Sequence, residues 1–250
     1  MLSVKKIYEK DNVARILIKG ADTAFVNGIR RTVMNAVPTL AVEDVSVYEN
    51  SSILFDEFIA QRIGFLPIRT DPKRYKAGEK VTFMLEKEGP GTVYSRDIKS
   101  TDPKIEIELK KVPILKIKKG QKIKMEMKAA VGTGREHVKW QPAVISYQEL
   151  PIITLEKGCN LCDKCVKECP KGVLEVKGKK VTLKDPYMCN LCGNCRDVCD
   201  KHAINIDYEK NSFIINIENH GNLKNAQIFS LAAEILDEKN KEFRKILKSI

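Results

Sequence analysis

Apolar residues with helical spacing follow Asp22 near the start of the chain. Asp22 is a suitable N-cap, and Pro38 ends the pattern. The apolar positions between them recur at steps of three and four residues: Phe25, Val26, Ile29 and Val33. This spacing predicts one helix with a single apolar stripe, and Arg30 and Arg31 fall off that stripe.

A second, longer helix is predicted from about Leu223 to the last residue. One seam of it advances by three and four residues in alternation, namely Phe229, Ala232, Leu236, Lys239, Phe243, Ile246 and Ile250. Only Lys239 interrupts the apolar character of this seam. A second stripe consists of Ile228, Leu231 and Ile235. A wide stripe facing one core is the simpler interpretation. Two stripes favour a helix that packs on its own domain and on a second chain.

Alternation of apolar and polar residues predicts strands elsewhere in the chain. The runs are 13–18, 42–48, 80–85, 104–109, 122–128 and 213–217. Asp56 is expected to cap a short helix that ends at Gly64. Helices at the ends and strands between them predict an α+β fold.

The 250 residues carry a formal net charge of +11, which raises the possibility of nucleic-acid binding. Nine lysines lie between Lys104 and Lys128, but many alternate with apolar residues, as on the solvent-exposed face of half-buried strands. We therefore favour a solvated face over a direct DNA contact. No apolar run is long enough to span a membrane, and the first residues contain no apolar core of a signal peptide. We expect a cytoplasmic protein.

Candidate metal chemistry is confined to residues 159–199, which contain all eight cysteines. A cytosolic chain keeps its thiols reduced, so this clustering indicates a metal centre rather than disulfides. Two runs share the spacing Cys-x2-Cys-x2-Cys-x3-Cys, and the second repeats the first after 30 residues. Structural zinc usually takes two separated cysteine pairs, whereas four thiolates within so short a run, occurring twice, fit two [4Fe–4S] clusters better.

In the two-cluster ferredoxin pattern, three thiolates of a run bind one cluster and the fourth reaches the other. The expected ligands of cluster I are Cys159, Cys162, Cys165 and Cys199. The expected ligands of cluster II are Cys189, Cys192, Cys195 and Cys169. Hairpin-like stretches are predicted after each run, at 173–183 and 203–217, which gives a ferredoxin-like module over 157–209. The second run ends in Cys199-Asp200 where the pattern favours Cys-Pro, so the attachment of Cys199 is an open question.

Three further segments carry a family resemblance. Residues 27–41 (NGIRRTVMNAVPTLA), 56–68 (DEFIAQRIGFLPI) and 132–142 (GTGREHVKWQP) resemble, in order, three signatures of the RNA polymerase α-like family. That family includes the bacterial α N-terminal domain and the archaeal D subunit, and an inserted ferredoxin-like module is peculiar to D subunits.

The resemblance implies a discontinuous dimerisation domain (1–41 and 210–250), an insert domain (42–156) and the iron–sulfur domain (157–209). It also implies pairing with the small subunit L through helices at about 22–36 and 224–248. The implied dimerisation residues are Phe25, Ile29, Val33, Phe229, Ala232, Leu236, Phe243 and Ile246. The implied docking residues, which would form or support a surface for the large subunits and other small assembly subunits, are Asn27, Arg30, Arg31, His137, Lys139 and Trp140.

Simpler interpretations stand beside these roles. Taken alone, Arg30 and Arg31 fit a solvated helix face, and Trp140 fits a core. No catalytic set is visible around the histidines, the 132–134 glycines do not form a phosphate loop, and no Asp-rich triad for nucleotide addition is present. We therefore expect a noncatalytic subunit of the polymerase. The alternative function is electron transfer by a ferredoxin, which would account for only about a fifth of the chain.

Overall fold

A computed structural model of the chain describes residues 1–71, 74–75, 78–156 and 158–249. These residues form two compact units. The first unit comprises residues 1–10, 14–27 and 146–216, and the second comprises residues 11–13, 28–145 and 217–250. Ile250, the last position of the expected heptad seam, and Lys157, the expected start of the iron–sulfur domain, lie outside the described residues.

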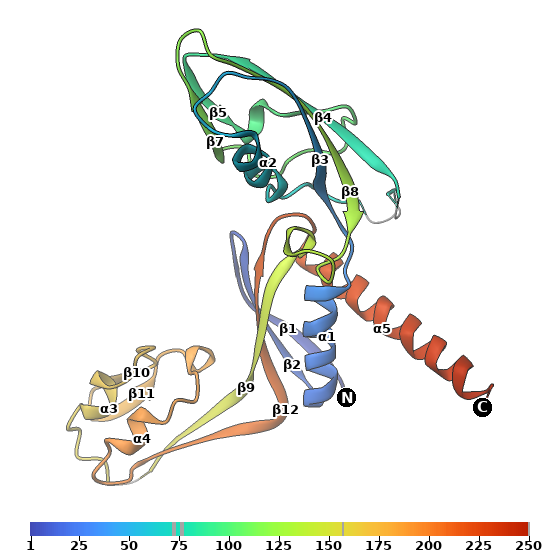
Figure 1. Ribbon diagram of the computed structural model, residues 1–250. Helices are drawn as coiled ribbons and strands as arrows, with labels where there is room; N and C mark the ends of the chain where they lie inside the picture. Colours follow the sequence, from blue (N-terminus) through green and yellow to red (C-terminus); the bar gives the residue numbers. More distant parts are fainter. Residues whose placement is uncertain (72–73, 76–77, 157, 250) are drawn as a thin grey trace. The chain divides into compact units, whose positions relative to one another are not determined.

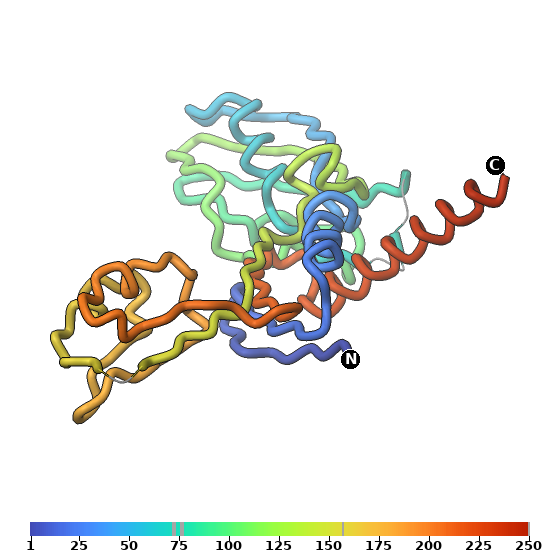
Figure 2. The backbone as a smooth tube through the Cα atoms, turned by 90° about the horizontal axis from the view of Figure 1, so that it is seen from below, coloured from blue at the N-terminus to red at the C-terminus, as the bar shows by residue number. Residues whose placement is uncertain are grey.

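A four-stranded sheet with the order β1-β2-β12-β9 contributes most of the strands of the first unit. Its strands are β1 (Ser3–Lys10), β2 (Val13–Lys19), β12 (Ile204–Asn219) and β9 (Ala143–Leu155). β9 and β12 are distant in sequence but lie side by side (Figures 1 and 2). A small core of Leu17, Leu150 and Ile214 packs within this unit.

The stretch 203–217 was expected to be hairpin-like, and this expectation is wrong. It belongs to the single long strand β12, in which Asn211 adopts a left-handed backbone with φ 55° without reversing the chain. The carbonyl of Asn211 accepts a hydrogen bond from the Gly20 N–H at 2.7 Å. Lys19 pairs with Glu209 at 2.8 Å. These contacts with the β2 end hold the strand extended.

The cysteine-rich part of the first unit contains only short elements. They are α3 (Lys164–Lys167), β10 (Leu174–Lys177), β11 (Lys180–Leu183), the 3-10 turn η3 (Pro186–Met188) and α4 (Asn194–Asp197). β10 and β11 pair antiparallel with Lys177 opposite Lys180, which confirms the expected hairpin at 173–183. Figure 1 shows the hairpin beside α3 and α4.

The second unit contains a sheet with the order β3-β8-β4-β6. Its strands are β3 (Thr39–Asn50), β8 (Lys122–Gly132), β4 (Lys80–Glu88) and β6 (Lys99–Ser100). Alternate residues of β4 and β8 are buried, as the two-residue period predicted. The smaller pair β5 (Gly91–Tyr94) and β7 (Pro113–Ile117), the helix α2 (Asp56–Gly64) and the 3-10 turns η1 (Ser95–Asp97) and η2 (Val138–Trp140) complete the β-rich part. Its apolar core includes Ile59, Ile63, Phe83 and Met125, which are almost fully buried.

Two local expectations for this unit are wrong. Residues 104–109 do not form a strand, because their backbone groups bond to the loop after α2: the Arg69 N–H bonds to Glu106 and the Glu108 N–H to Pro67, both at 2.9 Å. A single bridge joins Ile68 and Ile107. The N-cap of α2 is Phe55 rather than Asp56. Asp56 is the first helical residue, and its carboxylate accepts a hydrogen bond from Asn50 at 2.7 Å.

Both long helices form where they were expected. α1 spans Thr23–Asn35. The carboxylate of Asp22 accepts a hydrogen bond from the Phe25 N–H at 2.7 Å, which confirms the predicted cap. α5 spans Asn225–Leu247 and buries Ile228 and Ala232 near its start. From residue 237 to residue 249 every side chain is exposed.

Candidate iron–sulfur centre

The two cysteine runs adopt the same local backbone. In each run a loop carries the first two cysteines and a one-turn helix, α3 or α4, carries the third. A turn then carries the fourth cysteine. Residues with left-handed backbone occur at matching positions of the two runs: Leu161 and Leu191, Asp163 and Gly193, and Gly172 and His202. The 30-residue sequence repeat is thus a repeat of conformation.

The left-handed backbone at Leu161 and Leu191 is unusual, because their φ values are 57° and 59° and leucine carries a Cβ. A left-handed residue costs roughly 1–2 kcal/mol. Such strain persists where the surrounding structure requires it, often at functional sites. Each leucine stands between two cysteines whose thiols lie near one another, Cys159 and Cys162 around Leu161 and Cys189 and Cys192 around Leu191.

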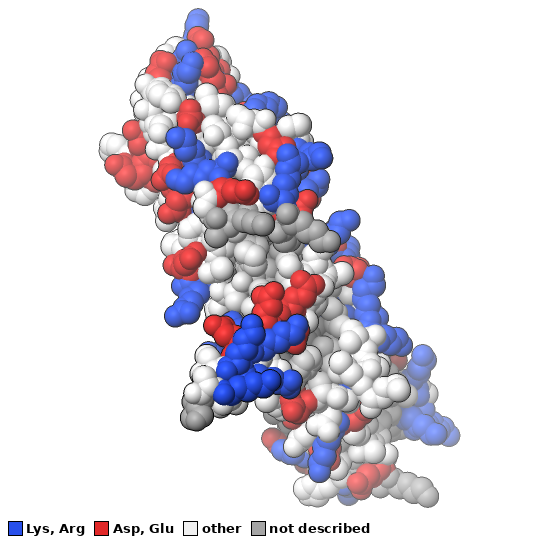
Figure 3. Space-filling view, turned by 90° about the vertical axis from the view of Figure 1, so that its right-hand side faces the viewer, with Lys and Arg blue, Asp and Glu red and all other residues white. Residues whose placement is uncertain are grey.

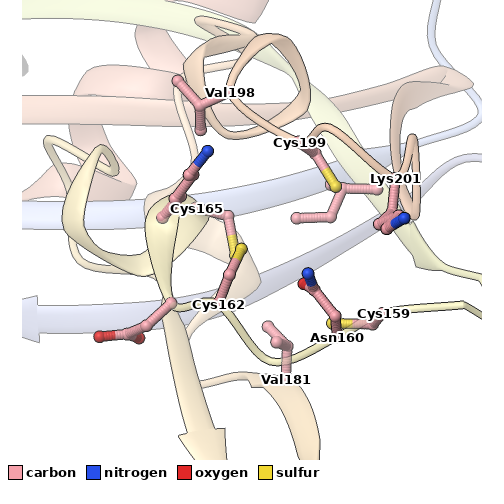
Figure 4. A pocket seen from close by; sticks show the side chains of 11 residues that line it. Cys159, Asn160, Cys162, Cys165, Val181, Val198, Cys199 and Lys201 are labelled. Carbon is pink, nitrogen blue, oxygen red and sulfur yellow. The ribbon is translucent and has the colours of Figure 1, made fainter.

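One cavity collects the four thiols expected to bind cluster I. Cys159, Cys162, Cys165 and Cys199 line a space of ≈ 320 Å³, together with Val181 and other side chains (Figure 4). This volume includes the open mouth of the cavity. Cys199 therefore joins the first run in space although it belongs to the second run in sequence. Burial raises the pKa of the Cys165 thiol, and the nearby thiolates of Cys159 and Cys199 raise it further.

The other four thiols also lie near one another. Burial raises the pKa of Cys195 to about 11, with further contributions from the neighbouring thiolates of Cys169, Cys189 and Cys192. Cys189 has a raised pKa for the same reasons, burial first and then Cys169 and Cys192. Four thiols that destabilise one another's charged forms gain from a cationic metal centre, which binds the thiolate form.

Backbone N–H groups point at three of the sulfur atoms. Val173 donates to Cys169 Sγ at 3.4 Å, Leu191 to Cys189 Sγ at 3.4 Å, and Ala203 to Cys199 Sγ at 3.3 Å. The bonds to Cys169 and Cys199 are again related by the repeat. Hydrogen bonds of this kind orient metal ligands and stabilise the negative charge of iron–sulfur clusters.

The donor set fits an iron–sulfur cluster. It consists of soft thiolates in two groups of four, with backbone N–H donors directed at three of the sulfur atoms. In the described ranges no three His, Cys, Asp or Glu side chains are arranged to hold one metal ion. All eight cysteines are free thiols in the structure.

The residues expected at a protein interface are divided between core and surface. Ile29, Val33 and Ala232 are buried within the chain itself, and Phe229 and Leu236 are half-buried. Phe25, Phe243 and Ile246 are exposed. Asn27 and Arg30 are half-buried, Arg31 is exposed, and Arg30 Nη1 donates to Met34 Sδ at 3.5 Å.

The expected docking residues of the third segment form one connected group. Trp140 is buried and donates from Nε1 to the Ala130 carbonyl at 3.0 Å. Lys139 lies over its ring, donates to the Val42 carbonyl at 3.0 Å and pairs with Glu43. The exposed His137 ring packs edge-on to Trp140 and against Phe65. Trp140 and Lys139 thus hold this segment in place, while His137 lies at the surface.

Two surface features were not anticipated. Tyr48, Ile53, Phe55, Phe58 and Phe65 are exposed apolar side chains on and around α2. They occur at irregular spacing, so periodicity gave no signal for them. The second feature is an ion pair between Lys164 and Asp200 at 2.6 Å, which joins the two cysteine runs.

Surface charge is mixed. Lys122 and Lys124 pair with Glu86, and Lys80 pairs with Asp44, so lysines of the outer sheet face are largely matched by carboxylates. The face drawn in Figure 3 shows positive and negative side chains interspersed. Among the described residues, no helix combines the length and apolar character needed to cross a membrane.

Comparisons with known proteins cover the β-rich part and the cysteine module. Residues 53–152 match the model of the RNA polymerase Rpb3/RpoA insert domain. Residues 149–218 match the model of the 4Fe-4S dicluster domain.

Curated proteins named DNA-directed RNA polymerase subunit Rpo3 match almost the whole chain. The protein of Methanosarcina acetivorans is 40% identical, covering 96% of this chain and 96% of its own length. That of Archaeoglobus fulgidus is 39% identical, covering 100% of this chain and 99% of its own length. That of Pyrococcus furiosus is 32% identical over 97% of this chain and 95% of its own length.

Proposed function

Because the chain belongs to the family of archaeal DNA-directed RNA polymerase subunit Rpo3, we propose that it is a noncatalytic assembly subunit of that enzyme. In this proposal it forms a heterodimer with the small subunit L in the cytoplasm. The pair is then the platform on which the large catalytic subunits and other small assembly subunits gather for transcription. The chain's own task is to bind partners, and nucleotide addition occurs on the large subunits.

The exposed apolar end of α5 is the observation that carries the assembly role. Phe243, Ile246 and Leu247 are 59%, 54% and 52% exposed, although the same helix buries Ile228 and Ala232 near its start. A helix end that stays in water does not need apolar side chains in order to form, because lysine and glutamate also have high helix propensity. Apolar groups that stay in water on an isolated chain favour a protein partner that covers them. The helical spacing of Phe243 and Ile246 suits a partner helix.

The docking surface for the large subunits is proposed to lie at the first and third segments of family resemblance. His137 and Arg31 are exposed and available to a partner. Trp140 and Lys139 hold the third segment in place through the bonds to Ala130 and Val42. Asn27 and Arg30, which are half-buried on α1, are the other proposed docking residues.

Two [4Fe–4S] clusters are proposed for the cysteine module. Cys159, Cys162, Cys165 and Cys199 would hold the first, and Cys169, Cys189, Cys192 and Cys195 the second. A bound cluster supplies cross-links between the two runs and a centre that can be oxidised. The chain's residues orient the thiolates through the N–H donors of Val173, Leu191 and Ala203. We assign the clusters a mainly structural role, because the apolar core cluster that the described residues of the module form has seven buried members, and three of these are cysteines.

Electron transfer of the ferredoxin type is the competing function, and it is not favoured by the family. It would leave the insert domain and both long helices without a role. The two functions differ in what they require of partners, since a soluble electron carrier needs only brief encounters with its partners.

The test is the solution mass of the anaerobically purified chain with and without subunit L, together with iron and sulfide analysis. We expect a stable one-to-one complex that contains about eight irons and eight sulfides per chain. A chain that remains a well-behaved monomer in the presence of L and of the large subunits would refute the assembly role. Absence of iron and sulfide from an anaerobic preparation would refute the cluster assignment.

A further inference from the structure

The two cysteine runs differ at the residue after the fourth cysteine. Cys169 is followed by Pro170, whereas Cys199 is followed by Asp200. The backbone assignments of the two runs are otherwise the same from the loop to the start of the next strand. Proline fixes its own φ near −65° and restricts the residue before it. Pro170 therefore stiffens the chain at Cys169, and the chain at Cys199 lacks that restraint.

Asp200, which takes the place of the proline in the second run, forms an ion pair. The Lys164 Nζ donates to the carboxylate of Asp200 at 2.6 Å. Lys164 lies between Cys162 and Cys165 and is the first residue of α3. The pair thus ties the residue next to Cys199 directly to the first cysteine run.

The second site has no counterpart of this pair. The residues at the equivalent positions of the repeat are Asn194 and Pro170, which cannot form a salt bridge. The first site is also the more open one: Cys159 and Cys162 are exposed, whereas in the second group only Cys192 is exposed. The two sites therefore hold their fourth cysteine by different means.

We propose that the Lys164–Asp200 ion pair is a clasp that positions Cys199 as the fourth ligand of the first cluster, in place of the proline that stiffens the second site. The inference rests on the proposed assignment of the eight cysteines to two clusters. Its consequence is that the first cluster is retained less firmly when ionic strength rises. The second cluster is held by Pro170 and does not share this dependence.

The expected effect is modest. The Lys164 and Asp200 side chains are 52% and 69% exposed, so water and salt screen their attraction. The Debye length falls from about 10 Å at 0.1 M salt to about 3 Å at 1 M. Exposed ion pairs of this kind correspond to changes of roughly two- to fivefold in an equilibrium or a rate. A change of that size is measurable when the second cluster serves as an internal reference.

The experiment follows cluster loss from the full chain in its complex with subunit L. An iron chelator is added anaerobically at about 0.1 M and about 1 M salt, and the visible absorbance and released iron are recorded. We expect two phases in the wild type, of which only the faster responds to salt. Cys162→Ser identifies that phase as the first cluster by removing it.

Lys164→Gln and Asp200→Asn should each accelerate the salt-sensitive phase by about two- to fivefold at low salt and abolish its salt response. Asp200→Asn is the more specific test of the two, because this variant keeps the lysine charge beside the cluster. If Lys164 acted only through its charge on the cluster, Asp200→Asn would leave the rate unchanged, and the clasp would be refuted. Lys167→Gln is the matched control: it removes one positive charge from the same helix without touching Asp200.

Two rescue variants separate the clasp from general damage to the module. Lys164→Asp combined with Asp200→Lys restores the pair with reversed charges, and Lys164→Gln combined with Asp200→Pro supplies the restraint of the second site. Both should return the fast phase to the wild-type rate, and the proline variant should be insensitive to salt. Acceleration of both phases alike, or failure of both rescues, overturns the proposal. A preparation without iron and sulfide would instead refute the underlying cluster assignment.

Discussion

The backbone of Gly134 lies against the carbonyl oxygen of Met34. A Cβ placed on Gly134 would come within 1.9 Å of that oxygen and 3.0 Å of its carbonyl carbon. The next residue, Arg135, donates its N–H to the carbonyl of Asn35 at 3.0 Å. The glycine-rich loop is therefore attached to the last turn of α1. Two segments of family resemblance, far apart in sequence, form one structure at this point.

Gly134→Ala should disrupt this attachment. The overlap is with backbone atoms, which cannot turn aside as a flexible side chain could. We expect a loss of roughly 1–3 kcal/mol in the free energy of unfolding, with weaker binding of the large subunits. Fluorescence of Trp140, the only tryptophan, monitors unfolding of the unit that contains the loop.

Gly64→Ala is the matched control for this variant. A Cβ at Gly64 would meet its nearest neighbour, the Val42 carbonyl oxygen, at an ordinary 3.8 Å. Equal stability of the two alanine variants would contradict the steric argument.

Local chemistry made part of this fold predictable. The cap at Asp22, the alternation in β8 and the hairpin at 173–183 depend on residues close in sequence, and the structure has all three. The arrangement of the cysteines could also be predicted from the sequence, because the 30-residue spacing encodes a repeated conformation. The position of Cys199 beside the first run follows from that repeat.

Other features depended on contacts that no local pattern contains. Ile105 and Ile107 are buried as their alternation suggests, but their segment bonds to the loop after α2 and forms no strand. Asn211 takes a left-handed backbone inside a continuous strand, where a turn was the natural interpretation. The Lys164–Asp200 pair joins residues from opposite ends of the module, and only the folded chain reveals it.

Phe243→Ser should weaken binding of subunit L without destabilising the isolated chain. The Phe243 side chain is 59% exposed, so its removal costs little core burial. Aromatic residues at the centre of an interface often contribute 2 kcal/mol or more, which corresponds to a rise in Kd of roughly 30-fold. Calorimetric titration of the variant with L measures this change.

Lys245→Ser is the control: it alters an exposed residue of the same helix and should leave the Kd within about threefold of the wild-type value. Similar affinities for the two variants would argue against this end of α5 as the contact surface.

Replacement of Cys189, Cys192 and Cys195 by serine should unfold the cysteine module and leave the pair with L intact. Three of the four proposed ligands of one cluster are lost, and two of them are also buried core residues. We expect rapid hydrogen exchange over residues 159–203, with unchanged exchange in β3 and β8. Asn190→Ser changes an exposed residue of the same loop and should retain both clusters and the native exchange pattern. Native protection in the triple variant would show that the clusters do not hold the module together.

Asp97 should contribute stability to the second unit in a manner that depends on pH. Burial raises the pKa of its carboxyl group, but hydrogen bonds from Lys87 and from the Tyr94 N–H lower it more, so the pKa lies below its ordinary value. The two bonds measure 2.6 Å and 2.8 Å. A depressed pKa means that the carboxylate stabilises the fold above the pKa of the unfolded chain. This contribution is lost as the pH falls through the pKa of the folded state.

Asp97→Asn should therefore lower the free energy of unfolding by roughly 1–3 kcal/mol at pH 7. The difference from the wild type should begin to shrink as the pH falls below about 4, because the unfolded wild-type chain then binds a proton at Asp97. It should disappear once the pH has fallen through the lower pKa of this carboxyl in the folded state. Urea unfolding followed by Trp140 fluorescence at several pH values measures both effects. Asp44→Asn is the matched control, because Asp44 forms a similar ion pair with Lys80 on the exposed face of the sheet, where pairing contributes little. If the difference in the free energy of unfolding between the wild type and Asp97→Asn stayed constant from pH 7 to pH 3, the carboxylate charge would not be the source of the stability.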